Sequence, residues 1–311
     1  TLVTPSDTVS VALVVTVIAV FGIPHGAVDH LVEASRQSLM SATASARASR
    51  VRQIRFHVVY IAAMLAFGLV WLAAPALALV AFLVMSVHHF GQSDLAYLRL
   101  GGRRQIVAQL SRGLVLVGLP LVAHLSTIAP VIERLGGPDP TTWAWLDRHA
   151  TGWCVALVAQ HVVVGLFVAS DLPDRSIVVR ELVTVAVLTA LLVRADPLVG
   201  FAVYFGLWHS LNHLHVLAQV LGRGAPGGSL PPMQLVRMVA PRTTVSLVAL
   251  VALVIAVSVA DRPGWILPIT LVFVSMLTVP HMFVVERLWR AQSPVGNRPD
   301  GVGQVPGTAT C

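Results

Sequence analysis

Nine apolar stretches follow one another along the chain, and each is long enough to cross a membrane as a helix. A spanning helix needs about 20 mostly apolar residues. Several joints between the stretches carry turn residues, among them Ala74-Pro75 and Ala195-Asp196-Pro197. The pattern therefore predicts an all-α, polytopic transmembrane helix bundle. The predicted spans cover residues 8–25, 56–74, 76–93, 106–127, 151–170, 179–195, 197–219, 243–260 and 264–285.

The spans are predicted to form a single integral membrane domain, residues 1–290. Segment 33–55 is polar and rich in arginine, and it is predicted to be an amphipathic or irregular cytoplasmic linker. Residues 291–311 are rich in glycine, proline and small polar side chains, a composition that predicts a disordered C-terminal tail.

The composition agrees with a membrane protein. The chain is 56% hydrophobic and only 11% charged, whereas soluble domains carry about 25% charged residues. Its net charge of +7 comes entirely from arginine, because the sequence contains no lysine. These arginines are spread over the short segments between apolar stretches rather than gathered in one block, which argues against a nucleic-acid partner and for a lipid bilayer.

The arginine distribution also predicts an orientation. All but four of the 21 basic residues fall after the first, third, fifth and seventh spans or in the tail; the four are Arg134, Arg148, Arg194 and Arg262. Cytoplasmic loops attract positive charge. We therefore expect the N-terminus outside and the C-terminus inside the plasma membrane.

Four short motifs place histidines inside or at the ends of these spans. They are PHGAVDH (24–30), SVHHFGQSD (86–94), WHSLNHLH (208–215) and PHMFVVE (280–286). On the predicted topology all four lie toward the cytoplasmic side, at one membrane depth. Ionisable groups at that depth are costly and indicate a functional site, and imidazole binds iron, copper and zinc well. The motifs predict an intramembrane metal site.

His209 and His213 are four residues apart, so a helix places both rings on one face, where one metal ion can bind them. The alternative is interhelical hydrogen bonding within a bundle. Ser210 and Asn212 offer hydrogen bonds that could orient the ring nitrogens.

His25 lies between Pro24 and Gly26, where proline weakens helical bonding and glycine permits a close approach. Asp29, four residues later, could accept the distal N–H of His25. The alternative is an ordinary helix end in the headgroup region, the interpretation we adopt for His30.

The other histidines are less defined. His88 and His89 point about 100° apart on a helix, and periodicity alone does not choose between them. His281 could be a fifth ligand, a donor that supports a ligand, or a substrate contact, and His57 could support the site from the start of the second span. The remaining histidines are predicted to be structural: His124, His149, His161 and His215.

Other chemistries are excluded by what the sequence lacks. It has no P-loop, no GxGxxG and no serine nucleophile elbow. Without lysine it cannot form the Schiff base of a retinal-binding pump. Two cysteines, Cys154 and Cys311, provide neither a disulfide framework nor a cysteine metal site.

PHGAVDH, S-x-x-HFG-x-x-D and WHS-x-x-H, in this order, resemble the Brp/Blh family of membrane β-carotene 15,15′-dioxygenases. The resemblance runs from about Phe21 to Glu286. It implies cleavage of the central double bond of β-carotene by O₂ to give two retinal molecules. It also implies a non-haem Fe(2+) held by four histidines, which by motif are His25, His89, His209 and His213. A retinal-binding rhodopsin is then a candidate acceptor of the product.

The implied substrate is a long hydrocarbon, which suits a tunnel between helices. Several aromatic side chains are predicted near the metal and could contact substrate, although core or lipid-facing packing is the alternative; they are Phe90, Tyr204, Phe205, Trp208 and Phe283. Further predicted supporting or substrate-contact residues are Asp29, His57, His88, Asn212 and His281.

Two other classes of function stay open at this point. A membrane di-iron hydroxylase, desaturase or ketolase shares HxxxH but needs HxxHH boxes, and this chain has only HxxxHxH and one isolated HH. The second alternative is a protein that is not an enzyme, namely a bis-histidine haem protein or a transporter. Haem would give a Soret band, and a transporter often has an inverted repeat.

Overall fold

The computed structural model describes residues 16–40, 45–98, 100, 102–170, 172, 174–222 and 228–292, and within these residues all regular structure is helical. The first half contains η1 (Ile18–Gly22), α2 (Ile23–Ala27), α3 (Asp29–Met40), α4 (Ala46–Ala73), α5 (Pro75–Asp94), α6 (Gly102–Ala123), α7 (Leu125–Arg134) and α8 (Pro140–Arg148). The second half contains α9 (Ala150–Ala169), α10 (Arg175–Arg194), α11 (Pro197–Ala202), η2 (Val203–Ser210), α12 (Leu211–Leu221), α13 (Pro232–Val259), η3 (Pro263–Trp265) and α14 (Ile266–Gln292).

Seven of the described helices are long and apolar enough to cross a membrane: α4, α5, α6, α9, α10, α13 and α14. The all-α polytopic bundle is thereby confirmed, and the count of nine spans stays a prediction. Predicted span 8–25 is described only from residue 16 and is divided into η1 and α2, while span 197–219 is divided into α11, η2 and α12. The elements η1 and η2 are π-helices.

Several helices begin earlier than the apolar pattern predicts. The polar segment 33–55 is not an irregular linker where it is described, because α3 and α4 occupy most of it. The Ser45 side chain caps α4 by accepting a hydrogen bond from the backbone N–H of Ala48 at 3.3 Å. Likewise α13 begins at Pro232 rather than at 243. Of the predicted tail, residues 291 and 292 end α14 and the remainder lies outside the described residues.

The joints that carry turn residues end and start helices as predicted. Pro75 and Pro197 each lie in the first turn of a helix, where the missing N–H is not needed. Asp196 caps α11 by accepting from the backbone N–H groups of Leu198 and Val199. Asp174 caps α10 in the same manner, through Ser176.

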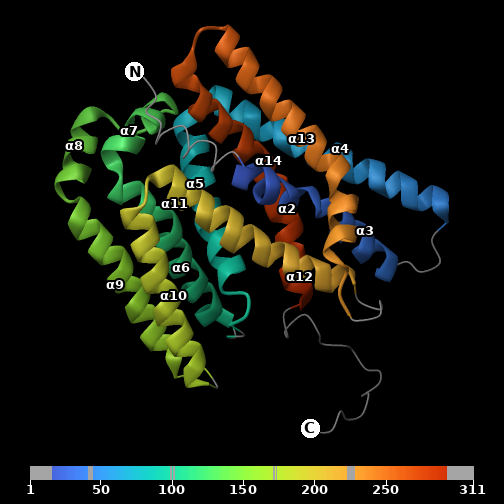
Figure 1. Ribbon diagram of the computed structural model, residues 1–311, viewed down its shortest axis with the longest axis horizontal. Helices are drawn as coiled ribbons and strands as arrows, with labels where there is room; N and C mark the ends of the chain where they lie inside the picture. The colour runs from blue at the N-terminus through green and yellow to red at the C-terminus, as the bar shows by residue number, and fades with distance from the viewer. Residues whose placement is uncertain are drawn as a thin grey trace.

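Figure 1 shows α6, α9 and α10 side by side on one side of the molecule and α3, α4 and α13 on the other. Between the two groups lie α2, α5 and α14, which are far apart in sequence. A hydrogen bond of 2.8 Å from the indole N–H of Trp71 to the Ser275 hydroxyl joins α4 to α14. The centre of the bundle is therefore built from segments near the start, the first third and the end of the chain.

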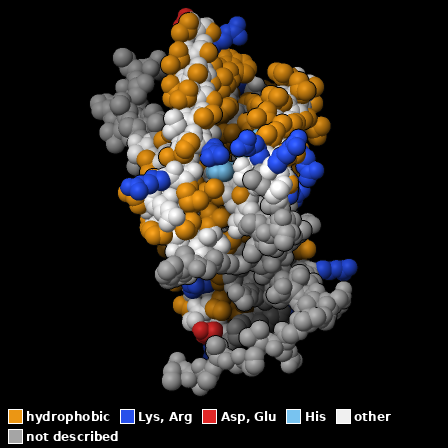
Figure 2. Space-filling model, turned by 90° about the vertical axis from the view of Figure 1, so that its right-hand side faces the viewer, with side chains coloured by type: hydrophobic (Ala, Val, Ile, Leu, Met, Phe, Trp, Pro, Cys, Tyr) orange, Lys and Arg blue, Asp and Glu red, His pale blue; other side chains and the backbone are white. Residues whose placement is uncertain are grey.

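The outer faces of the spanning helices are apolar. Leu72 and Val259, for example, are 83% and 81% exposed. Figure 2 shows hydrophobic side chains over much of one face, with arginine side chains gathered across its middle. An extended apolar exterior of this kind is unfavourable in water and fits a lipid environment.

Helices α5 and α6 cross with their backbones in direct contact. A Cβ added at Gly91 would overlap the carbonyl group of Gln109, and one added at Gly113 would overlap the carbonyl group of Val87. Small residues are what allow two membrane helices to approach so closely. This crossing fixes the position of the α5 turn that contains His89.

Replacing Gly91 with alanine should lower the stability of the protein. The new methyl group collides with backbone, which cannot rotate away, so α5 and α6 must separate, at a cost of at least about 1–3 kcal/mol. The thermal unfolding temperature in detergent should fall. A Cβ at Gly165 in α9 would meet nothing within 4 Å, so Gly165→Ala should leave that temperature unchanged or raise it. Equal unfolding temperatures for the two variants would contradict the close crossing.

Candidate metal centre

The four histidines of the three main motifs come together in the interior. His25 lies on α2, His89 on α5, His209 on η2 and His213 on α12, and none is more than 6% exposed. The ring centroids of His25 and His209 are 5.4 Å apart, those of His25 and His213 5.8 Å, and those of His89 and His209 5.1 Å. The rings of His209 and His213, the HxxxH pair, are parallel, with an interplanar angle of 3°. Rings from three distant parts of the sequence thus form one cluster.

Three members of this cluster have nitrogens close enough together to share a metal ion, and His213 is not part of that close group. One nitrogen from each of His25, His89 and His209 lies within 4.8 Å of the other two. Two ligands on opposite sides of a metal, with bonds of ~2.0–2.2 Å, are about 4.0–4.4 Å apart. The buried Nε2 of His209 and Nδ1 of His213 make no hydrogen bond with the protein. Buried nitrogens without a partner are rare in folded proteins, and a shared metal ion would satisfy them.

A fifth ring, that of His281 on α14, belongs to the same cluster. It is 4% exposed, and its centroid lies 4.9 Å from that of His25 and 5.2 Å from that of His89. Its Nδ1 donates to the Asp29 carboxylate, 2.9 and 3.0 Å from the two oxygens. The Tyr60 hydroxyl donates to the same carboxylate at 2.9 Å.

This pairing corrects the predicted partner of Asp29. The carboxylate contacts His281 rather than His25, because Nδ1 of His25 donates instead to the backbone carbonyl of Gly22. The hydroxyl of Ser210 lies 3.3 Å from the same Nδ1 and donates to the Phe205 carbonyl at 2.6 Å. The hydrogen of His25 is thereby held on Nδ1, which leaves Nε2 with a lone pair.

The helix breaks coincide with the site. The π-helix η1 ends at Gly22, three residues before His25, and η2 contains His209. Pro24 has no N–H to donate back along the helix, which disrupts the regular α-helical pattern there. A Cβ at Gly206 in η2 would overlap the side chain of Val17, so the two broken segments pack closely. Such π segments occur often at functional sites.

Predicted aromatic contacts are partly realised. The Phe205 ring stacks on His209 with centroids 5.8 Å apart, and the Phe90 ring meets His209 edge-on at 4.9 Å. Tyr204 is 2% exposed and its ring lies 6.3 Å from that of His209. By contrast, Phe283 is 63% exposed and points away from the interior. The buried cluster is therefore lined on one side by aromatic rings.

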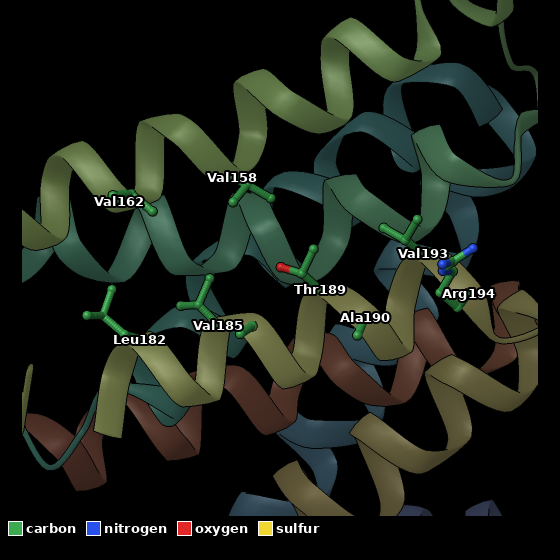
Figure 3. A pocket seen from close by; sticks show the side chains of 9 residues that line it. Val158, Val162, Leu182, Val185, Thr189, Ala190, Val193 and Arg194 are labelled. Carbon is green, nitrogen blue, oxygen red and sulfur yellow. The ribbon is translucent and has the colours of Figure 1, made fainter. Parts of the chain in front are cut away.

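An apolar surface groove of about 420 Å³ lies elsewhere, between α9 and α10. Figure 3 shows its lining, which includes Val158 of α9 and Val185 of α10. None of the clustered histidines lines it. The residues Leu188 and Leu192 of α10 pack inward instead, in a buried apolar cluster with Tyr204.

Comparison with known proteins identifies the family. A family model described as beta-carotene 15,15′-dioxygenase matches residues 16–289, nearly the whole chain. The chain belongs to the beta-carotene 15,15′-dioxygenase family. Membership in this family of enzymes favours carotenoid cleavage over the hydroxylase, haem-protein and transporter alternatives.

Two relatives of this family can be named. The chain is 31% identical over 208 residues to the "Beta-carotene 15,15′-dioxygenase" of uncultured marine bacterium 66A03, covering 67% of this chain and 68% of that protein. It is 26% identical over 314 residues to the "Probable beta-carotene 15,15′-dioxygenase Blh" of Halobacterium salinarum, covering 92% of this chain and 86% of that protein. No solved structure matches the chain.

Some predicted site residues of this family member lie outside the cluster. The His88 side chain is 40% exposed and its Nε2 lies 3.3 Å from the Glu286 carboxylate. The ring of His57 lies 6.3 Å from that of His30, and its Nδ1 contacts the Gln53 carbonyl. The Asn212 side chain is on the exposed face of α12. Their positions in the sequence suggested that these residues lie near the site. In the structure the rotation of each helix about its axis directs their side chains away from the histidine cluster.

The structure also contains a buried charged network that spacing did not predict. Arg112 is 1% exposed within α6, so it is not one of the loop arginines assumed from the sequence. Its guanidinium pairs with Asp94 at 2.6 Å and with Glu181 at 3.2 Å. The indole N–H of Trp208, which is itself 42% exposed, donates to Asp94 at 2.7 Å. This network joins α5, α6 and α10 to η2, next to His209. An arginine inside an apolar stretch was the signal available in the sequence.

Removing the charge of Arg112 should strongly destabilise the protein. Arg112→Met leaves the buried Asp94 and the partly buried Glu181 without a cation, and breaking a buried ion pair on one side typically costs about 3–5 kcal/mol. Denaturant or thermal unfolding in detergent measures the loss. Arg103→Met on the exposed face of the same helix should stay within about 0.5 kcal/mol of the parent. A similar small effect at both positions would argue against the network.

Proposed function

We propose that this chain cleaves the central 15,15′ double bond of β-carotene with O₂, giving two molecules of retinal, at an Fe(2+) centre held by His25, His89, His209 and His213. The observation that carries the proposal is the convergence of the three family motifs on one buried set of imidazoles. The family match and the names of the two relatives support the substrate and the bond that is cleaved.

The overall reaction balances without added protons or reductant. One carbon–carbon double bond and the O–O bond break, and two carbon–oxygen double bonds form. The two carbons are oxidised and O₂ is reduced. Ferrous iron with neutral imidazole ligands and open positions supplies the capacity to bind O₂.

The residues of the chain have three tasks in this scheme. The carbonyl of Gly22 and the hydroxyl of Ser210 hold the hydrogen of His25 on Nδ1, so that Nε2 keeps a lone pair with which it could bind the metal. The rings of Phe90 and Phe205 pack on His209 and offer an apolar wall to a polyene. Because every ligand ring is buried, bulk water is kept from the reacting carbons.

The membrane setting suits a substrate that dissolves in lipid. Seven of the described helices are apolar enough to cross a membrane, so a polyene could approach the site sideways from lipid without entering water. We further propose that the protein resides in the plasma membrane with its C-terminus in the cytoplasm, as the arginine distribution predicts. A retinal-binding rhodopsin remains a candidate acceptor for the product.

His213→Ala should lower both bound iron and retinal formation to near background, because it removes one of four ligands from a buried site. His215 provides the matched control: it lies two residues further along α12, is exposed, and contacts Gln219. His215→Ala should keep most of both properties. Iron content of purified protein and retinal yield measure the effect. Full iron occupancy in the His213→Ala protein would remove the ligand assignment, and removal of iron by a chelator should abolish activity reversibly.

The products formed from β-carotene test the reaction itself. In cells that make β-carotene, expression of the chain should give retinal as the only major cleavage product, since the central bond must lie beside the metal. Chromatography with mass detection separates the possible products. Apocarotenals of unequal length would mean eccentric cleavage, and hydroxylated carotenoid with an intact chain would favour a di-iron hydroxylase instead.

A further inference from the structure

His281 has the features of a ligand, although it lies outside the three motifs that carry the family resemblance. Resting on the proposed function, we propose that His281 supplies a fifth imidazole to the metal through Nε2, and that Asp29 and Tyr60 fix the orientation of its ring. The site would then be a five-histidine centre with one of its ligands oriented by a carboxylate.

The contacts of Asp29 define which nitrogen of His281 is available. Both carboxylate oxygens lie 2.9–3.0 Å from Nδ1, so that nitrogen carries the hydrogen. Tyr60 donates to Asp29 from α4 and holds the carboxylate in place. A ligand histidine almost always donates its other ring N–H to a carboxylate or carbonyl. His281 has this arrangement, with a carboxylate as acceptor.

The ring of His281 lies among the clustered histidines, and its other nitrogen has no partner. Nε2 is buried and has no hydrogen-bond partner in the protein. The ring lies edge-on to three others, with centroids 4.9 Å from His25, 5.2 Å from His89 and 5.6 Å from His213. Of the clustered rings, His281 is thus in contact with members from α2, α5 and α12 at once.

A purely structural salt bridge between Asp29 and His281 explains these contacts less well. A contact with Asp29 alone uses only Nδ1 of His281 and leaves Nε2 buried without a partner. Buried polar atoms without a partner are rare in folded proteins. A metal ion held by the neighbouring rings would give Nε2 a partner.

The test counts imidazoles around the bound iron. Purified protein loaded with Fe(2+) is examined by X-ray absorption spectroscopy at the iron edge, and the affinity for iron is measured by competition with a chelator. The parent protein should show five imidazoles around the iron, and the His281→Ala variant should show four.

Asp29→Asn keeps the shape of the side chain but weakens the acceptor for Nδ1 of His281, so iron affinity should fall about 10–100-fold. Tyr60→Phe should reduce affinity by less, because it acts on Asp29 only.

Two controls keep the result interpretable. The ring of His88 contacts Glu286 rather than the cluster. His88→Ala should therefore leave the number of imidazoles around the iron unchanged. Free imidazole added to His281→Ala should restore iron affinity if the loss is one of ligation rather than of folding. If His281→Ala cannot be purified folded, the affinity of Asp29→Asn decides the matter, and an unchanged affinity overturns the proposal.

The outcomes separate this inference from the proposed function. An unchanged imidazole count in a His281→Ala protein that still binds iron and forms retinal overturns the fifth ligand and leaves the four-histidine enzyme intact. A parent protein that binds no iron overturns both. Loss of one imidazole together with retained binding by the other four supports both.

Discussion

Burying several imidazoles inside a bundle that is apolar on its outside is the constraint on which the rest of this structure depends. Each ring nitrogen must find a partner, because an unsatisfied polar group in such surroundings costs several kcal/mol. The chain meets the requirement in two ways. Some nitrogens are held by nearby oxygens, those of Gly22 and Ser210 for His25 and that of Asp29 for His281. Three others, Nε2 of His209, Nδ1 of His213 and Nε2 of His281, are buried without a partner in the protein, and a shared cation would satisfy them. The arrangement of donors is therefore the strongest physical argument for a metal centre.

The same constraint explains where the helices are broken. The continuous spans act as a scaffold, and the α5–α6 crossing at Gly91 and Gly113 is tight enough to fix the turn of α5 that contains His89. The two segments that are not continuous α-helices, η1–α2 and α11–η2–α12, are the ones that provide His25, His209 and His213. Irregular backbone at membrane depth is tolerated only where protein or a cavity surrounds it. Here the breaks are packed inside the bundle, with Gly206 against the segment before His25.

A second buried polar unit stabilises the first from outside. Arg112 neutralises part of the charge of Asp94 and Glu181, and Asp94 in turn holds the indole of Trp208 next to His209. Arg112, Asp94 and Glu181 lie on α6, α5 and α10, and within the described residues none of them forms an ion pair with the clustered imidazoles. The acidic group that contacts the cluster is Asp29, through His281.

The sequence by itself determined the class of the fold and most of the cluster. Apolar length predicted the spans, and each of the seven continuous ones overlaps a predicted span, although α4 and α13 begin about ten residues earlier than predicted. The histidine motifs predicted the rings that meet, because an HxxxH pair shares a helix face regardless of what surrounds it. Only the tertiary structure decided which oxygen serves which ring, that Asp29 belongs to His281 and not to its neighbour four residues away, and that His88 and Asn212 turn outward. It also decided that Arg112 is buried. These choices depend on helix rotation and on contacts between α2, α4 and α14, which are distant in sequence, and periodicity along one helix contains no information about its rotation against another.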